Sequence, residues 1–260
     1  MYPYIELFDH SKIPSYILMI SLAFSIAVIW AYKKSKKLKY KTSFALDLSL
    51  VIMVSGFIGG RAFHVFYEEP TYYLNHPENI LKFWQGGFVF YGGLLTVLLV
   101  TFVFCRLQKR SYLFWADFFA PFGAFGYSLG RIGCFLNGCC YGDLCELPWA
   151  VVFPKILPHG LARHPTQLYA SIFELFILFA LLYFERRKIF RYRGQLFCAW
   201  IFLHGCNRIT MEMFRADPRG DQIFGLSVST LISLFLIAAS LVSFLVIKKN
   251  SDKKRLQLQN

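Results

Sequence analysis

Seven long apolar runs, separated by polar connections, set the pattern along this chain of 260 residues. Their approximate ranges are 14–32, 43–67, 86–104, 112–129, 168–184, 194–214 and 223–247. Each run approaches the ~20 apolar residues that a helix needs to cross a bilayer. Because lipid cannot hydrogen-bond to a bare backbone, membrane-spanning segments are helices or closed barrels. The pattern predicts an all-α polytopic membrane protein with seven transmembrane helices, and we expect residues 1–260 to form a single bundle.

Composition and charge placement support this assignment. Apolar residues make up 56% of the chain. The net charge of +13 is the excess of 28 lysines and arginines over 15 aspartates and glutamates, and most of the basic residues follow alternate runs. The clusters fall at 33–41, 106–110, 186–193 and 248–255. By the positive-inside rule, the N-terminus is expected outside and the C-terminus in the cytoplasm. The basic residues therefore indicate membrane topology, and we do not interpret them as a surface for nucleic acid. The first ten residues lack the basic region of a cleaved signal peptide, so we expect the first run to remain.

Four arginines lie toward the external ends of apolar runs, namely Arg61, Arg131, Arg208 and Arg215. Charged groups within a membrane are costly and are usually paired or functional. A single arginine in such a place could extend to the interface with its charge in water. Four at one depth favour a shared site for an anion.

The sixth run carries a polar face. His204, Arg208, Glu212 and Arg215 are spaced 4, 4 and 3 residues apart, which places them on one side of a helix. This face must turn away from lipid, either as a structural ladder of ion pairs or toward an external cavity.

Two aspartates also lie within apolar runs. Asp117, in the middle of the fourth run, is expected to be a structural partner of a polar group, whereas Asp47 is assigned no function.

The external connections differ from the internal ones. Residues at about 131–167 include four prolines and an alternating stretch at 149–153, which predict a small irregular head between the fourth and fifth helices. In the first part of the third run, the pairs Gly86-Gly87 and Gly92-Gly93 permit either close helix packing or the approach of backbone to a ligand.

The stretch G-R-I-G-C-F-L-N-G-C-C-Y-G at 130–142 is the strongest motif. Glycines around a fixed Arg131 predict a bent backbone with free N–H groups, which is suited to an anion. Four of the seven cysteines gather here: Cys134, Cys139, Cys140 and Cys145. Their spacing lacks the C-x-x-C of zinc sites, and simple packing, disulfides, a metal site and a reactive thiol all stay open. The other three cysteines are expected to fill helix interfaces.

Several motifs together resemble the prolipoprotein diacylglyceryl transferase family. They are the 130–142 stretch, G-G-R in the second run, D-F-F-A-P in the fourth, L-P-W-A-V-V-F-P, R-H-P-T-Q-L-Y, and R-x-x-x-E-x-x-R-x-D at 208–217. The resemblance implies a multi-pass enzyme of the bacterial inner membrane that works in lipoprotein biosynthesis. Such an enzyme moves diacylglyceryl from phosphatidylglycerol to the lipobox cysteine of a prolipoprotein, forms a thioether and releases glycerol phosphate. Its partners are those two substrates and membrane lipids, and no metal or organic cofactor is implied.

The resemblance also suggests site residues. Arg131 and Arg208 match the two key arginines of the family, and Tyr16 matches a tyrosine of the first span. The signature and H-P-x-Q-L-Y elements supply Gly130, Gly133, Asn137, Gly142, Gln167 and Tyr169. We therefore expect substrate binding by Arg131, Arg208, Asn137, Gly142, Gly92, Gly93, Arg61, Tyr16, Gln167, Tyr169 and Glu212.

The chain also departs from the family pattern. Tyr91 stands where the family has a histidine, His204 where it has a tyrosine, Cys134 replaces an asparagine and Cys139 a glutamate. We expect the same roles to be redistributed, with Arg131 and Arg208 holding phosphate and either His204 or Tyr91 taking the thiol proton. The alternative is a non-catalytic or diverged membrane protein that binds anionic lipid or handles thiols. A transporter is disfavoured by the odd number of spans and the lack of repeats.

Overall fold

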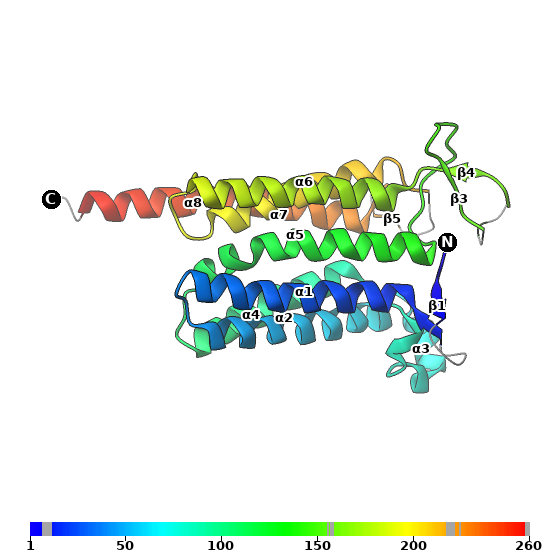
Figure 1. The fold of residues 1–260 in the computed structure, drawn as a ribbon, viewed down its shortest axis with the longest axis horizontal. Helices are drawn as coiled ribbons and strands as arrows, with labels where there is room; N and C mark the ends of the chain where they lie inside the picture. The colour runs from blue at the N-terminus through cyan, green and yellow to red at the C-terminus, as the bar shows by residue number, and fades with distance from the viewer. Residues whose placement is uncertain (7–11, 155, 157–158, 217–221, 224, 258–260) are drawn as a thin grey trace. The chain divides into compact units, whose positions relative to one another are not determined.

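The computed structural model describes residues 1–6, 12–154, 156, 159–216, 222–223 and 225–257 (Figure 1). Within them the fold is helical apart from three short antiparallel hairpins. The long helices are α1 (Ser15–Lys37), α2 (Thr42–Phe63), α4 (Phe90–Leu107), α5 (Tyr112–Asn137), α6 (Thr166–Arg187), α7 (Gln195–Glu212) and α8 (Val228–Gln257). The short helical segments are η1 (His64–Glu68), α3 (Pro70–Asn75), η2 (Pro77–Asn79) and η3 (Phe83–Gln85). The strands are β1 (Tyr4–Glu6), β2 (Lys12–Pro14), β3 (Val151–Val152), β4 (Ala162–Arg163), β5 (Gln222–Ile223) and β6 (Leu226–Ser227).

Five of the described helices are long and apolar enough to cross a membrane: α1, α2 with η1, α4, α6 and α8. This confirms a polytopic, all-helical membrane protein. The two other predicted runs fall on α5 and α7, which are also long helices but are not among these five. Seven spans therefore stay a prediction. Helix α1 runs past the expected boundary into the first basic cluster, where lysines in its last turn favourably oppose the helix dipole.

The chain forms two compact units. One comprises Met1–Ser25 with Leu113–Asn260, and the other Ile26–Tyr112. The continuous helix α1 contributes residues to both.

In the second unit α2 packs closely along α4 (Figure 1). Glycines make this possible: a Cβ added to Gly59 would lie 2.2 Å from the Thr96 hydroxyl, and one added to Gly93 would lie 2.9 Å from the Gly56 carbonyl oxygen. A Cβ on Gly92 would likewise meet the Phe63 ring. The glycine pair of α4 thus serves helix packing, one of its two predicted uses.

In the first unit α7 packs along both α6 and α8 (Figure 1). The Ser128 and Ser171 hydroxyls lie 2.8 Å apart and link α5 to α6. The start of α1 packs against the end of α5, where a Cβ on Gly133 would lie 3.2 Å from the Tyr16 ring. These contacts place the signature stretch, α6 and α7 around one location.

Asp117 of α5 caps the first turn of α7. The backbone N–H groups of Gly194 and Phe197 donate to its two carboxylate oxygens at 2.5 and 2.8 Å. The first N–H groups of a helix have no partner within the helix, so a carboxylate from a neighbouring helix satisfies them. The expectation that Asp117 is a structural partner is confirmed.

The segment between α5 and α6 is largely irregular. Its β3 and β4 pair in antiparallel register, with Val151 opposite Arg163, and the strand lies within the predicted alternating stretch 149–153. The segment reaches α6 at Pro165, so it connects the end of α5 to the start of α6.

We predict that Asp117→Ala lowers the stability of the protein by about 1–2 kcal/mol, because two N–H groups at the start of α7 lose their acceptor. The measurement is the melting temperature in detergent micelles. Asp47→Ala, which removes an exposed carboxylate from α2, is the matched control and should leave the melting temperature unchanged. Equal melting of both variants would contradict the capping role.

Candidate functional site

Arg131, in the last two turns of α5, is held by an aromatic ring. Its guanidinium carbon lies 4.8 Å from the centroid of Tyr127, one turn earlier on the same helix. Tyr127 is buried and packs with Ala170 of α6 and Met211 of α7. A cation above an aromatic face is attracted by the ring electrons, more strongly where water is excluded. Arg131 therefore rests on a surface to which three helices contribute.

Arg208 lies in α7 next to this surface. It is 5% exposed, and its Nη1 lies 2.9 Å from Oε2 of Glu212, one turn further on. The predicted polar face of α7 is thereby confirmed as an i,i+4 ion pair. Arg131 and Arg215 both lie close enough to Arg208 to interact with it electrostatically. Three guanidinium groups thus gather at one location, an arrangement that suits an anion such as a phosphate.

A buried carboxylate behind the arginines was missed in the sequence. Glu174 of α6 is fully buried, and His204 lies with its Nδ1 3.1 Å from the Glu174 carboxylate. Asn207 donates to the same carboxylate at 2.8 Å and Trp200 at 3.1 Å. Three donors from α7 thus converge on one acceptor. The signal available in the sequence was an acidic residue inside an otherwise apolar run.

Tyr127 joins this network to Arg131. The Tyr127 and His204 rings meet edge to face, with their centroids 4.6 Å apart. His204 is 1% exposed, so it lies behind Tyr127 and does not open to the surface. This burial supports a second role for His204, acting through Tyr127 on Arg131, beside its predicted role as acceptor of the thiol proton.

The signature loop is anchored to the start of α6. After Asn137 the chain turns through Gly138, with φ +80°, and Cys140, with φ +65°. The Gln167 side-chain amide donates to the Cys139 carbonyl at 2.6 Å, and the Thr166 hydroxyl donates to the Cys140 carbonyl at 2.7 Å. Gln167, expected to bind substrate, thus has its amide N–H group engaged in holding the loop.

Gly142 lies where three segments cross. Its N–H donates to the His164 carbonyl at 2.9 Å, and it pairs with Arg215 in an isolated bridge. An added Cβ would lie 2.6 Å from the His164 Cβ and 2.7 Å from the Phe214 carbonyl oxygen. Only glycine fits this crossing, which fixes Arg215 beside the signature loop.

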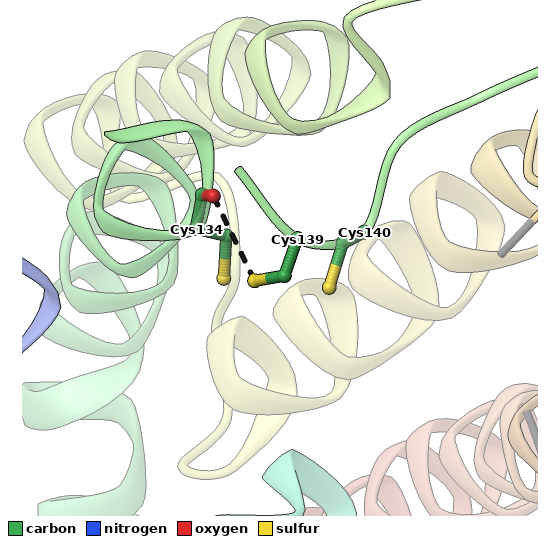
Figure 2. Close-up of side chains that lie close together, drawn as sticks. All are labelled: Cys134, Cys139 and Cys140. Carbon is green, nitrogen blue, oxygen red and sulfur yellow. Dashed lines mark hydrogen bonds between the residues drawn. The ribbon is translucent and has the colours of Figure 1, made fainter. Parts of the chain in front are cut away.

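Three thiols come together at the end of α5 (Figure 2). The Sγ atoms of Cys134, Cys139 and Cys140 all lie within 4.8 Å of one another, and the cysteines are free. Hydrogen bonds from the two neighbouring thiols and the positive charges of Arg131 and Arg215 hold the pKa of the Cys140 thiol well below its usual value. Cys145, the fourth cysteine of this stretch, is not a member of this group.

Two further candidates surround this loop. Tyr16 of α1 lies close enough to Arg131 and to all three thiols to interact with them electrostatically. Tyr169 accepts a hydrogen bond at 2.8 Å from the Trp149 indole, and its hydroxyl lies 3.2 Å from His164 Nδ1. The structure thus brings together, from the predicted set, Tyr16, Arg131, Asn137, Gly142, Gln167, Tyr169, His204, Arg208 and Glu212.

The remaining candidates lie in the second unit: Arg61, Tyr91, Gly92 and Gly93. The Arg61 guanidinium donates to four backbone carbonyls, those of Asn79, Ile80, Gly86 and Gly87, at 2.6–3.2 Å. These bonds give it a structural role in holding the connection that precedes α4. Tyr91 is buried at 4% exposure. Substrate binding by Arg61 and the glycines, and catalysis by Tyr91, stay predictions.

Comparisons with known proteins agree with one another. A family model described as prolipoprotein diacylglyceryl transferase matches residues 4–246. The chain is similar to phosphatidylglycerol–prolipoprotein diacylglyceryl transferase of Clostridium tetani, with 34% identity over 248 residues that cover 95% of this chain and 96% of that protein. It is 34% identical to the protein of the same name from Bordetella avium over 249 residues, 92% of each chain. The one from Wolbachia pipientis is 32% identical over 240 residues, 89% of this chain and 91% of its own.

We predict that Gly142→Ala destabilises the protein by about 1–3 kcal/mol, because the new methyl group overlaps atoms of two neighbouring segments. Gly126→Ala is the matched control, since nothing lies within 4 Å of its added Cβ and alanine favours a helix by up to ~1 kcal/mol. Melting temperatures in detergent should fall for the first variant and hold or rise for the second. A melting temperature of Gly142→Ala at the wild-type value would exclude the proposed crossing.

Proposed function

The chain belongs to the prolipoprotein diacylglyceryl transferase family, and from that membership we infer that it is a transferase of lipoprotein biosynthesis. It transfers diacylglyceryl from phosphatidylglycerol to the lipobox cysteine of a prolipoprotein, in the bacterial inner membrane. The observation that supports this activity most directly is the gathering of Arg131, Arg208 and Arg215 on helix ends beside a glycine-rich loop. The reaction needs such a gathering because its leaving group is a phosphate ester.

The proposed reaction needs cations that stabilise the leaving phosphate, and the arginines can supply them. The lipobox sulfur attacks the glycerol carbon that carries the phosphate, a C–S bond forms, the C–O bond breaks, and glycerol phosphate leaves with the bonding electrons. Negative charge grows on the phosphate in the transition state, where water gives little help. Guanidinium groups bind phosphate oxygens in pairs and keep their charge. Arg131 and Arg208 are proposed to hold the phosphate, and one such donor can contribute ~2.7–4 kcal/mol.

The thiol proton requires an acceptor, since a free cysteine with a pKa of ~8.5 is only a few per cent thiolate at neutral pH. His204 and Tyr91 stay the predicted acceptors. The burial of His204 and its bond to Glu174 support a second role for that pair, in which the network fixes Tyr127 and thereby Arg131. Glu174 is on this proposal a positioning residue.

The site is proposed to face the outer side of the membrane. Alternate basic clusters favour an external N-terminus and a cytoplasmic C-terminus. With seven spans in a single bundle, the ends of α5 and α7 and the head at about 131–167 would then lie outside. Asn137, Gly142, Gln167 and Tyr169 would form the wall of a lipid site there. Gly142 and Gln167 would do so by holding its backbone, and Tyr169 through its bonds to the Trp149 and His164 side chains.

The activity itself is tested by incubating the purified full chain with phosphatidylglycerol and a lipobox peptide, and following the diacylglyceryl mass increase on the peptide by mass spectrometry. We predict that Arg131→Lys lowers kcat/KM by about a hundredfold, because lysine keeps the charge but cannot bind two oxygens at once. Arg106→Lys, on an exposed position at the end of α4, is the control and should retain full turnover. Binding of phosphatidylglycerol without any modified peptide would instead favour the non-catalytic, lipid-binding alternative.

For Glu174→Gln we predict a fall in kcat of at least tenfold, ~1.4 kcal/mol in the barrier, with KM nearly unchanged. The amide offers one acceptor oxygen to three donors, so His204 is held less firmly, and Tyr127 and Arg131 are then less well fixed. The loss affects the reaction of bound substrate and not its binding. Ser128→Ala, which removes another buried bond between helices, should lower the melting temperature but leave kcat intact. If kcat falls together with the melting temperature in both variants, the effect of Glu174→Gln reflects lost stability, and Glu174 has only a structural role.

A further inference from the structure

We propose that the thiols of Cys134, Cys139 and Cys140 form a three-coordinate site for a single thiophilic metal ion, Cu(I), at the end of α5 (Figure 2). The chemistry inferred for the family needs no metal, although the Cys140 thiol lies within electrostatic range of Arg131 and Arg215 of the proposed phosphate site. Binding of the ion does not depend on the proposed transferase activity.

The positions of the sulfur atoms suit one central ion. All three Sγ atoms lie within 4.8 Å of one another, and the three side chains project to the same side in Figure 2. Metal–thiolate bonds of ~2.3 Å place sulfur ligands about 4 Å apart around a common ion. Small side-chain rotations therefore bring the sulfurs to bonding distance without a change in the backbone.

The backbone holds this arrangement in advance. Cys134 lies in the last turn of α5, and the left-handed residues Gly138 and Cys140 turn the chain back over the helix end. A left-handed conformation is unfavourable for a non-glycine residue and persists only where its surroundings fix it. Here Thr166 and Gln167 fix it through the two carbonyls of the cysteine pair. Backbone carbonyl groups therefore fix most of the loop, and the one hydrogen bond drawn from a thiol in Figure 2 runs from Cys139 Sγ to the Cys134 carbonyl at 3.7 Å. A metal ion would replace the proton of that thiol.

The surrounding charge favours a thiolate complex. Three thiolates and one Cu(I) carry a net charge of −2, which is costly to bury unless cations lie nearby. Arg131 and Arg215 are both within electrostatic range of Cys140, and Arg131 is also within range of Cys134. Two guanidinium groups thus balance the charge of the loaded site.

The ligand set selects the ion. Thiolates are soft ligands that favour Cu(I) or Zn²⁺ over Mg²⁺ and Ca²⁺, which take oxygen ligands. Structural Zn²⁺ sites are almost always four-coordinate. Within the described residues the group consists of three cysteines, with no histidine or carboxylate as a fourth member. Three sulfurs therefore point to Cu(I).

The test is an anaerobic titration of the reduced full chain in detergent with Cu(I), in competition with a chromogenic Cu(I) chelator. We expect one tightly held Cu(I) per chain with three sulfur neighbours in its X-ray absorption spectrum. Cys139→Ser and Cys140→Ser should each weaken binding at least tenfold. Cys206→Ser and Cys145→Ser, which remove thiols outside the group of three, are matched controls and should bind as the wild type.

A second readout uses the wild-type chain alone, in case a variant fails to fold. Bound Cu(I) should slow alkylation of the three thiols, as mapped by mass spectrometry, without slowing that of the other cysteines. The proposal is overturned by unchanged alkylation, by equal copper binding in all four variants, or by Zn²⁺ held in preference to Cu(I). A disulfide between two of the three cysteines in protein isolated without reductant would also overturn it, and would make the group a redox pair.

Discussion

Positive charge confined among membrane helices is the constraint on which this structure depends. An ion removed from water costs several kcal/mol unless neighbours stabilise it. Arg131 gains the face of Tyr127, and Arg208 gains the Glu212 carboxylate. With Arg215 close by, three guanidinium groups gather at one place. On the proposed function a bound phosphate ester would bring negative charge to them, so the gathering that is unfavourable for folding is the one that favours the substrate.

The sequence predicts those parts of the fold that follow from local patterns. Apolar runs of sufficient length locate the long helices, because lipid leaves the backbone few alternatives. The spacing of Arg208 and Glu212 predicts their ion pair, since residues four apart lie on one side of a helix. An isolated acid such as Asp117 signals a polar partner, although not which one. It proves to be the first turn of α7, which lies 77 and 80 residues further along the chain.

The remainder could not be predicted because it depends on contacts between distant segments. Glu174 lies in an apolar run, and its partner His204 is 30 residues away on another helix. The three thiols have no recognisable metal-binding spacing; left-handed turns at Gly138 and Cys140 bring them together. Gln167 belongs to a recognisable motif, yet its bond to the Cys139 carbonyl assigns it to the support of the loop. A motif identifies such residues but does not distinguish a substrate contact from a structural one.

The contacts that hold the loop involve its backbone, which explains how cysteines can occupy it. The carbonyl groups of Cys139 and Cys140 are held by α6, and Gly142 is fixed by His164 and the end of α7. The conformation of the loop thus rests on backbone groups that every residue type possesses. A thiol can therefore replace another polar side chain at position 139 without loss of the turn. What changes is the chemistry presented to Cys134 and Cys140, the two thiols that lie within electrostatic range of Arg131.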